Sequence, residues 1–158
     1  MYPTLERHLE QLVLLPGLAG HEPPVAEYMR DGFAACGLQV QEDVFGNVIA
    51  KRPGTDAQAP VLMVFAHMDS LGFFVRYIEP DGFLRLERMG GIPEKALPAT
   101  PVRVKTRDGK YLDGVIGIKQ HHLTPPEEKY VVDKYPKLFV DIGAASRDAV
   151  LAAGVVVG

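Results

Sequence analysis

The residues with the clearest chemical potential are His67 and Asp69, which follow an unbroken apolar run at residues 61–66. A short run without polar residues predicts a strand buried on both faces. Side chains two positions apart on an extended backbone point to the same side, roughly 6–7 Å apart. The pair therefore predicts one of two things. Either His67 is a metal ligand supported by Asp69, or both residues belong to a hydrogen-bonded loop.

Other histidines and carboxylates offer weaker candidates. His21 and Glu22 are adjacent and could bind a metal together, but their position before two prolines favours a helix-entry loop. His121 and His122 would point to opposite sides of an extended chain, which disfavours joint chelation. Their loop either faces an active site or a neighbouring subunit, or is simply solvated. Asp141 follows an apolar strand, where it is either a ligand or, as we favour, a structural carboxylate.

A nucleophilic hydrolase is disfavoured. The single cysteine, Cys36, lies in an apparent helix end, and the sequence contains no Gly-x-Ser-x-Gly elbow. The Asp-Gly pairs at 81–82 and 108–109 predict hairpin turns, because no EF-hand spacing surrounds them.

The composition is that of a globular protein. The chain has 158 residues, 47% of them hydrophobic, and a net charge of −3. The absence of a basic excess argues against nucleic acid or an anionic membrane as partner. One cysteine suits a reducing compartment, and the N-terminus shows no basic segment followed by an apolar core. We therefore expect a cytoplasmic protein.

The elements that must position His67 and Asp69 begin with two helices. Thr4 is expected to cap the first, whose apolar face includes Leu5 and Leu9; Gly37 is expected to end the second. A hairpin is expected over residues 38–43 and 48–51, before the buried strand. This order is typical of an α/β protein.

The sequence pattern changes near residue 71, from helices and a buried run to short strands. Short strands with tight turns and internal glycines predict a small closed or nearly closed β-barrel. A short helix capped by Ser146 follows the last of them. The strands are expected at residues 73–79, 83–87, 102–106, 111–118 and 138–141.

The α/β part looks incomplete. A strand that is apolar on both faces needs neighbours on both edges and cover on both faces. Residues 1–70 supply little of either, and the sequence closes with another strand-like apolar run at 155–157. We therefore expect both runs to expose apolar surface and the chain to self-associate.

Several short pieces, in order along nearly the whole chain, resemble one family. It comprises the cytosolic two-metal glutamyl and deblocking aminopeptidases that assemble into tetrahedral dodecamers, and its members are often named endoglucanases or cellulases. The matching pieces are Leu-Ala-Gly-His-Glu at 18–22, Val-Phe-Gly-Asn-Val at 44–48, Ala-His-Met-Asp-Ser-Leu-Gly-Phe at 66–73, Asp-Gly-Phe-Leu at 81–84, Gly-Gly at 90–91, Gly-Val-Ile-Gly at 114–117, His-Leu at 122–123, Leu-Phe-Val-Asp-Ile-Gly-Ala at 138–144 and the ending at Gly158.

The resemblance implies a fold. Residues 1–70 would be the N-terminal part of an α/β peptidase lobe, and residues 71–158 an inserted, PDZ-like barrel used for dimerisation. The complete enzyme would be a dimer that builds toward a dodecamer.

The resemblance also implies chemistry on peptide substrates. Two divalent ions, zinc or cobalt, would activate a water molecule, with a glutamate as general base. His67 matches the first histidine ligand, and Asp69 the catalytic aspartate that supports it. Ser70 departs from the usual glutamate at a position that is not a ligand. No substrate-binding residue can be assigned.

The family's other ligands and its general base lie beyond the position of Gly158. With one ligand, this chain is expected to bind metal weakly at a single site and to be inactive alone, because a site needs three or four ligands. The chain would then be truncated, cleaved or completed by a second polypeptide. The alternative is a non-catalytic β-barrel association module or remnant.

Overall fold

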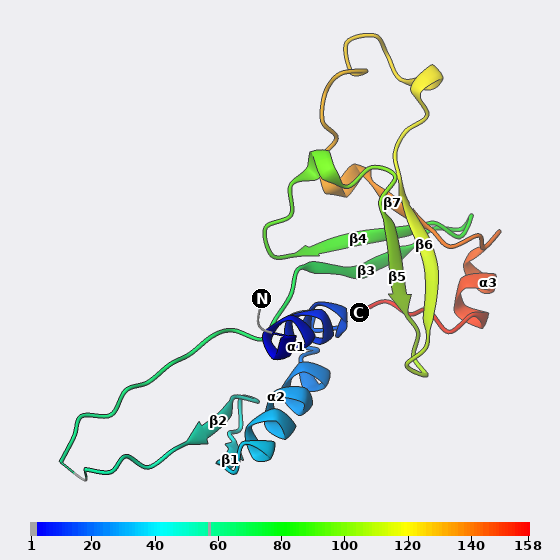
Figure 1. Cartoon of the computed structure of the whole chain (residues 1–158). Helices are drawn as coiled ribbons and strands as arrows, with labels where there is room; N and C mark the ends of the chain where they lie inside the picture. Colours follow the sequence, from blue (N-terminus) through cyan, green and yellow to red (C-terminus); the bar gives the residue numbers. More distant parts are fainter. Residues whose placement is uncertain (1–2, 57) are drawn as a thin grey trace. The chain divides into compact units, whose positions relative to one another are not determined.

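The computed structural model describes residues 3–56 and 58–158 of the chain (Figure 1). The chain divides into two compact units, Met1–Ser70 and Leu71–Gly158. We call the first the helical unit and the second the sheet unit. Within the described residues, no helix is both long enough and apolar enough to cross a membrane.

The helical unit contains two helices and a hairpin. Helix α1 spans Pro3–Leu14, α2 spans Pro23–Ala35, and the antiparallel strands β1 and β2 span Gln39–Glu42 and Val48–Lys51. Gly37 follows α2 with a φ of 73°, a conformation that favours glycine, so the predicted helix end is confirmed. Thr4 lies inside the first turn of α1 and not at its cap, contrary to expectation.

The turn of this hairpin is organised by Asp43. Its Oδ1 accepts hydrogen bonds from the backbone N–H groups of Phe45 and Asn47, at 2.9 and 3.0 Å. The Asn47 side chain donates to Oδ2 at 2.8 Å. These hydrogen bonds, that of the Asn47 side chain foremost, lower the pKa of Asp43.

The prediction of a buried strand at residues 61–66 is wrong. The segment lies outside any strand, and its side chains from Val61 to Phe65 are 75–88% exposed. β1 and β2 pair with each other, so they do not give this segment a neighbouring strand. The backbone of this apolar run is therefore not paired in a sheet, although a strand needs neighbouring strands for its hydrogen bonds.

The sheet unit is built on a five-stranded sheet in the order β3-β4-β7-β6-β5, in which every pairing is antiparallel. All five strands fall within two residues of the ranges that the sequence predicted, and the predicted short helix is present. The elements are β3 (Gly72–Ile78), β4 (Leu84–Met89), β5 (Pro101–Lys105), β6 (Tyr111–Gly117), β7 (Phe139–Asp141), α3 (Arg147–Ala152) and three 3₁₀ turns, η1 (Glu94–Ala96), η2 (His121–Leu123) and η3 (Tyr135–Lys137).

The sheet is curled and not closed. Figure 1 shows β3 and β4 running across the direction of β5 and β6. In the described part of the chain, β3 and β5 form the two edges and do not pair with each other. The expected mixed α/β fold is present, whereas the closed barrel is not confirmed.

The core of the sheet unit gathers side chains from the strands, the loops and α3. Ser146 begins α3 by accepting a hydrogen bond from the backbone N–H of Ala149 at 3.2 Å, as predicted for a cap. Val155, expected to be exposed, is instead fully buried, and only Val157 of that run is largely exposed. The fully buried large side chains are Leu84, Ile116, Leu138, Val150 and Val155.

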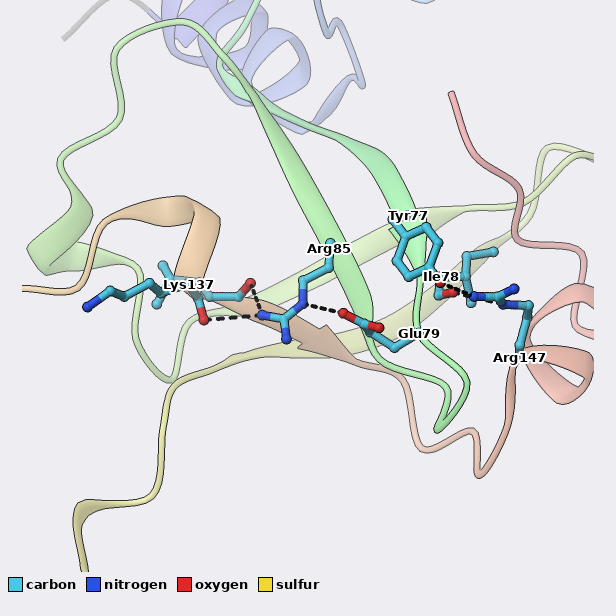
Figure 2. Close-up of polar contacts among 7 residues, drawn as sticks. Tyr77, Ile78, Glu79, Arg85, Lys137 and Arg147 are labelled. Atoms are coloured by element: carbon cyan, nitrogen blue, oxygen red, sulfur yellow. Dashed lines mark hydrogen bonds and ion pairs between the residues drawn. The ribbon is translucent and has the colours of Figure 1, made fainter. Parts of the chain in front are cut away.

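The seam between β4 and β7 has a single paired position, Leu84 with Val140. Arg85 reinforces it: its guanidinium donates to Glu79 at 2.8 Å and to the carbonyls of Lys137 and Leu138 at 3.3 and 3.4 Å (Figure 2). The side chain of one residue thus replaces ladder hydrogen bonds that a longer pairing would supply.

A second arginine fixes α3. The Arg147 guanidinium donates to the carbonyl of Ile78 at 2.9 Å and to the hydroxyl of Tyr77, and lies 4.9 Å from the Tyr77 ring centre (Figure 2). These contacts hold the start of α3 against the end of β3.

Candidate metal ligand and family relationship

His67 and Asp69 contact each other. His67 Nδ1 lies 2.9 Å from Asp69 Oδ1 and 3.0 Å from the backbone oxygen of Asp69. Both oxygens are acceptors, so this geometry requires the proton on Nδ1. The Nε2 atom is then the available ligand atom, since it meets no partner among the described residues.

The pair is exposed at the end of the extended segment. The His67 side chain is 85% exposed and the Asp69 side chain 47%. An imidazole whose second nitrogen donates to a carboxylate is the usual arrangement of a metal-ligating histidine. This arrangement can coordinate a cation through the lone pair of Nε2, with the ring oriented by Asp69.

The backbone beside the pair is held by the loop between α1 and α2. The N–H of Ser70 donates to the carbonyl of Gly17 at 2.6 Å, and Leu18 forms a parallel bridge with Ser70. This brings the loop containing His21 and Glu22 next to the exit of the extended segment. The contact was not predicted, because residues so far apart in sequence carry no local signal of pairing.

The described residues do not complete a metal site. No group of three or more histidine, cysteine, aspartate or glutamate side chains lies close enough to hold an ion within residues 3–56 and 58–158. His67 and Asp69 therefore fit the role of one ligand and its partner, but the donor set present does not fit a bound ion.

The other histidine candidates do not join His67 and Asp69 in a metal site among the described residues. Glu22 accepts a hydrogen bond from the backbone N–H of Gly20 at 2.8 Å, as a loop residue would. His121 and His122 form an edge-to-face contact in the exposed turn η2, with ring centres 5.8 Å apart. Neither pair belongs to a ligand group in the part of the chain that the structure describes.

Two carboxylates outside the pair, Asp141 and Asp108, accept local hydrogen bonds. Asp141 Oδ1 accepts from the backbone N–H of Gly143 at 2.8 Å, which supports its interpretation as a structural carboxylate. Asp108 lies in the β5–β6 turn and accepts from Lys110 at 2.7 Å and from the Thr106 hydroxyl at 2.5 Å. These two hydrogen bonds, that of Lys110 first, lower the pKa of Asp108 to about 2.

One polar cluster was not predicted from the sequence. The Tyr135 hydroxyl donates to Glu87 at 2.9 Å, which raises the pKa of Tyr135, and the Arg88 guanidinium lies 5.1 Å from its ring centre. The only local signal is the polar alternation of β4. The cluster fixes the end of the long loop that begins at residue 118 to β4.

Comparison with known proteins decides the family. The model of the M42 glutamyl aminopeptidase family matches residues 46–158, most of the chain. The chain belongs to this family. The match includes His67, Asp69 and the whole of the sheet unit.

Individual relatives agree with this assignment. SgcX of Escherichia coli (strain K12), whose name marks it as a candidate aminopeptidase, is 38% identical over 155 residues, which are 98% of this chain and 41% of SgcX. An aminopeptidase structure from the archaeon Desulfurococcus kamchatkensis superposes with a TM-score of 0.84 at 36% identity, covering 96% of this chain and 41% of that one. The mixed α/β fold is thus that of solved aminopeptidases.

A third relative bears on assembly. The TET1 peptidase of Pyrococcus horikoshii, described as assembling into a tetrahedron or a large octahedral shell, superposes with a TM-score of 0.77 at 30% identity. The match covers 91% of this chain and 42% of the relative. The M42 chain described here spans about two fifths of the length of the relatives it matches.

Proposed function

We propose that this M42 chain is part of a metal-dependent aminopeptidase that removes N-terminal residues from peptides. The observation that carries the proposal is the contact between His67 Nδ1 and the Asp69 carboxylate at 2.9 Å. It leaves Nε2 to bind a divalent ion, with zinc and cobalt as the expected metals. Asp69 would fix the tautomer and orientation of His67 and so raise the basicity of the ligand.

The remaining ligands and the general base would come from polypeptide outside residues 1–158. Supporting this are the single imidazole ligand and the absence of any larger ligand group among the described residues. The isolated chain would then bind metal weakly at one site and hydrolyse no peptide. The helical unit would be the N-terminal part of the peptidase lobe, and the sheet unit an inserted domain used for dimerisation.

The assembly and compartment follow as parts of the same proposal. The shells formed by the Pyrococcus horikoshii TET1 peptidase support a homo-oligomer built from dimers. A single cysteine supports the cytoplasm as the compartment.

A direct test uses the native protein. Its intact mass is measured, and its hydrolysis of leucyl and glutamyl 4-nitroanilides is assayed with added Zn²⁺ or Co²⁺. We expect hydrolysis only from a native protein that contains polypeptide in addition to the 17.3 kDa chain, and expect His67→Ala to lower kcat/KM at least about 100-fold. Hydrolysis by the His67→Ala protein at the wild-type rate would refute the proposal.

A second candidate function is a non-catalytic association module. It is favoured by the sheet unit, which has its own buried core and exposed apolar residues such as Tyr130 and Val131 on the long loop after β6. A native mass of 17.3 kDa per chain with no metal-dependent peptidase activity would favour this function.

A further inference from the structure

We propose that Gly17 is a positioning residue for the His67–Asp69 pair. It lies in the α1–α2 loop, remote in sequence from the pair. Its carbonyl accepts a hydrogen bond from Ser70, and it lies close to the carbonyl of Met68. Its importance for catalysis rests on the proposed role of His67 as a metal ligand.

Gly17 is buried against the segment that carries the pair. Its carbonyl accepts the 2.6 Å hydrogen bond from the N–H of Ser70, the residue after Asp69. A Cβ on Gly17 would lie 3.2 Å from the carbonyl oxygen of Met68, the residue before Asp69. The backbone immediately after the aspartate that contacts His67 is thus held by a hydrogen bond, and the carbonyl immediately before it lies close to Gly17.

The surroundings make this contact important. Upstream of His67, the side chains from Val61 to Phe65 are at least 75% exposed, so packing does not immobilise that part of the segment. Met68 is half-buried. The orientation of Asp69 therefore depends on the contact between its neighbours and Gly17. Asp69 in turn determines which ring nitrogen of His67 carries the proton.

A side chain at this position would be crowded. A methyl group there would lie 2.8 Å from Val25 Cγ2, which forces a shift, and 3.2 Å from the Met68 oxygen, which is tighter than most carbon contacts. The restriction is purely spatial, since the backbone of Gly17 does not have a positive φ. Gly17→Ala therefore pushes against Val25 on one side and against the Met68 carbonyl on the other.

The matched control is Gly32→Ala. Gly32 lies in helix α2, where an added Cβ meets nothing within 4 Å and φ is not positive. The same methyl group is thus added to the same unit without touching the segment that carries His67.

The test uses NMR of the full chain at about pH 8.5, well above the ordinary histidine pKa of about 6.5. The nitrogen shifts of the His67 ring report which nitrogen carries the proton, and hydrogen exchange reports the Ser70 hydrogen bond. In Gly17→Ala we expect Ser70 exchange to rise about tenfold or more and the Nδ1-protonated fraction to fall about twofold or more. Gly32→Ala should change neither.

Two further outcomes would overturn the proposal. One is an unchanged His67 tautomer in Gly17→Ala, whether or not Ser70 exchange rises; the other is the same shift in Gly32→Ala. If Gly17→Ala fails to fold, Gly17→Ala/Val25→Ala removes the 2.8 Å clash and keeps the 3.2 Å contact with Met68. The tautomer shift must then persist relative to Val25→Ala alone, and its loss would refute the role of Gly17.

A separate measurement isolates the proposed function. Zinc binding is compared between the wild-type chain and His67→Ala by competition with a chromophoric chelator. Equal binding would remove His67 as a ligand and leave the tautomer result intact, so the two proposals fail independently.

Discussion

Leu62 and Leu84 are the same residue type in two different settings. Leu62, in the helical unit, is 86% exposed, whereas Leu84, in the sheet unit, is completely buried. The same contrast extends to their neighbours: α1 exposes Leu5 and Leu9, while the strands of the sheet unit direct their apolar side chains into one core. The candidate ligand His67 therefore lies in the helical unit, whereas most of the buried core lies in the sheet unit.

The two units differ in whether their apolar segments find neighbouring strands within the same unit. The sheet unit satisfies its strands with antiparallel neighbours that lie within it. The helical unit carries an apolar run for which its own hairpin provides no pairing. A buried core therefore forms within residues 72–155, whereas the segment that leads to His67 pairs with no strand among the described residues.

Matched leucine substitutions measure the contrast directly. Leu84→Ala should lower the free energy of unfolding by about 2–5 kcal/mol, because it leaves a cavity in a closed core. Leu62→Ala should change it by less than about 0.5 kcal/mol. Urea unfolding followed by circular dichroism checks both, and equal effects would erase the distinction between the units.

Charge placed on the exposed run should abolish self-association. Val64→Lys is expected to return the chain to a monomer, because it disrupts an uncharged, unpaired segment of high strand propensity. Val132→Lys, on the exposed loop of the sheet unit, is the control and should leave self-association unchanged. Sedimentation velocity measures both, and a monomeric wild-type chain at high concentration would contradict the expectation.

The seam within the sheet unit should depend on Arg85. Arg85→Ala is expected to cost about 1–3 kcal/mol of stability, because it removes charge-assisted hydrogen bonds to Glu79 and to two carbonyls. Arg85→Lys should recover only part, since an ammonium lacks the planar fork. Arg103→Ala, which loses an exposed contact with the Tyr111 ring, should cost less. A cost for Arg103→Ala equal to that of Arg85→Ala would contradict the role of the seam.

The smallest expected effect compares the aspartate turns of the two units. Lys110→Ala should raise the pKa of Asp108 from about 2 toward its ordinary 3.8, because Lys110 is the main stabiliser of that carboxylate. The pKa of Asp43, lowered mainly by Asn47, should not move. Carbon NMR titration of both carboxyl groups measures this.

The same depression fixes the sign of the pH dependence. Because the folded-state pKa of Asp108 lies below its ordinary value, the stability it contributes is fully present above about pH 4 and is lost as the pH falls through about 2. In Lys110→Ala this acid-induced loss should shrink. The Asp108 side chain is 55% exposed, and solvent screens its ion pair, so the effect should be small.

Sequence reasoning worked best where structure is locally encoded. The strands of the sheet unit were predicted because alternation and Asp-Gly turns, such as Asp81-Gly82 and Asp108-Gly109, specify a hairpin within a few residues. The cap at Ser146 and the helix end at Gly37 have the same local character. Fold elements of this kind need no distant partner to be recognised.

It failed where the outcome depends on a partner. Residues 61–66 have the composition of a buried strand, but a strand exists only when neighbours pair with it. For the candidate site, the contact between His67 and Asp69 followed from their spacing. The hydrogen bond between Ser70 and Gly17 did not, because only the folded chain brings that loop to the pair.

The single paired position between β4 and β7 has a consequence for folding kinetics. β3–β4 and β5–β6 are local hairpins that close over short loops, whereas Leu84 and Val140 are 56 residues apart in the chain. Short-range hairpins form quickly, and the entropy of closing the long loop is lost before the seam returns any contact energy. Docking of β7 on β4 is therefore the step expected to set the refolding rate of the sheet unit.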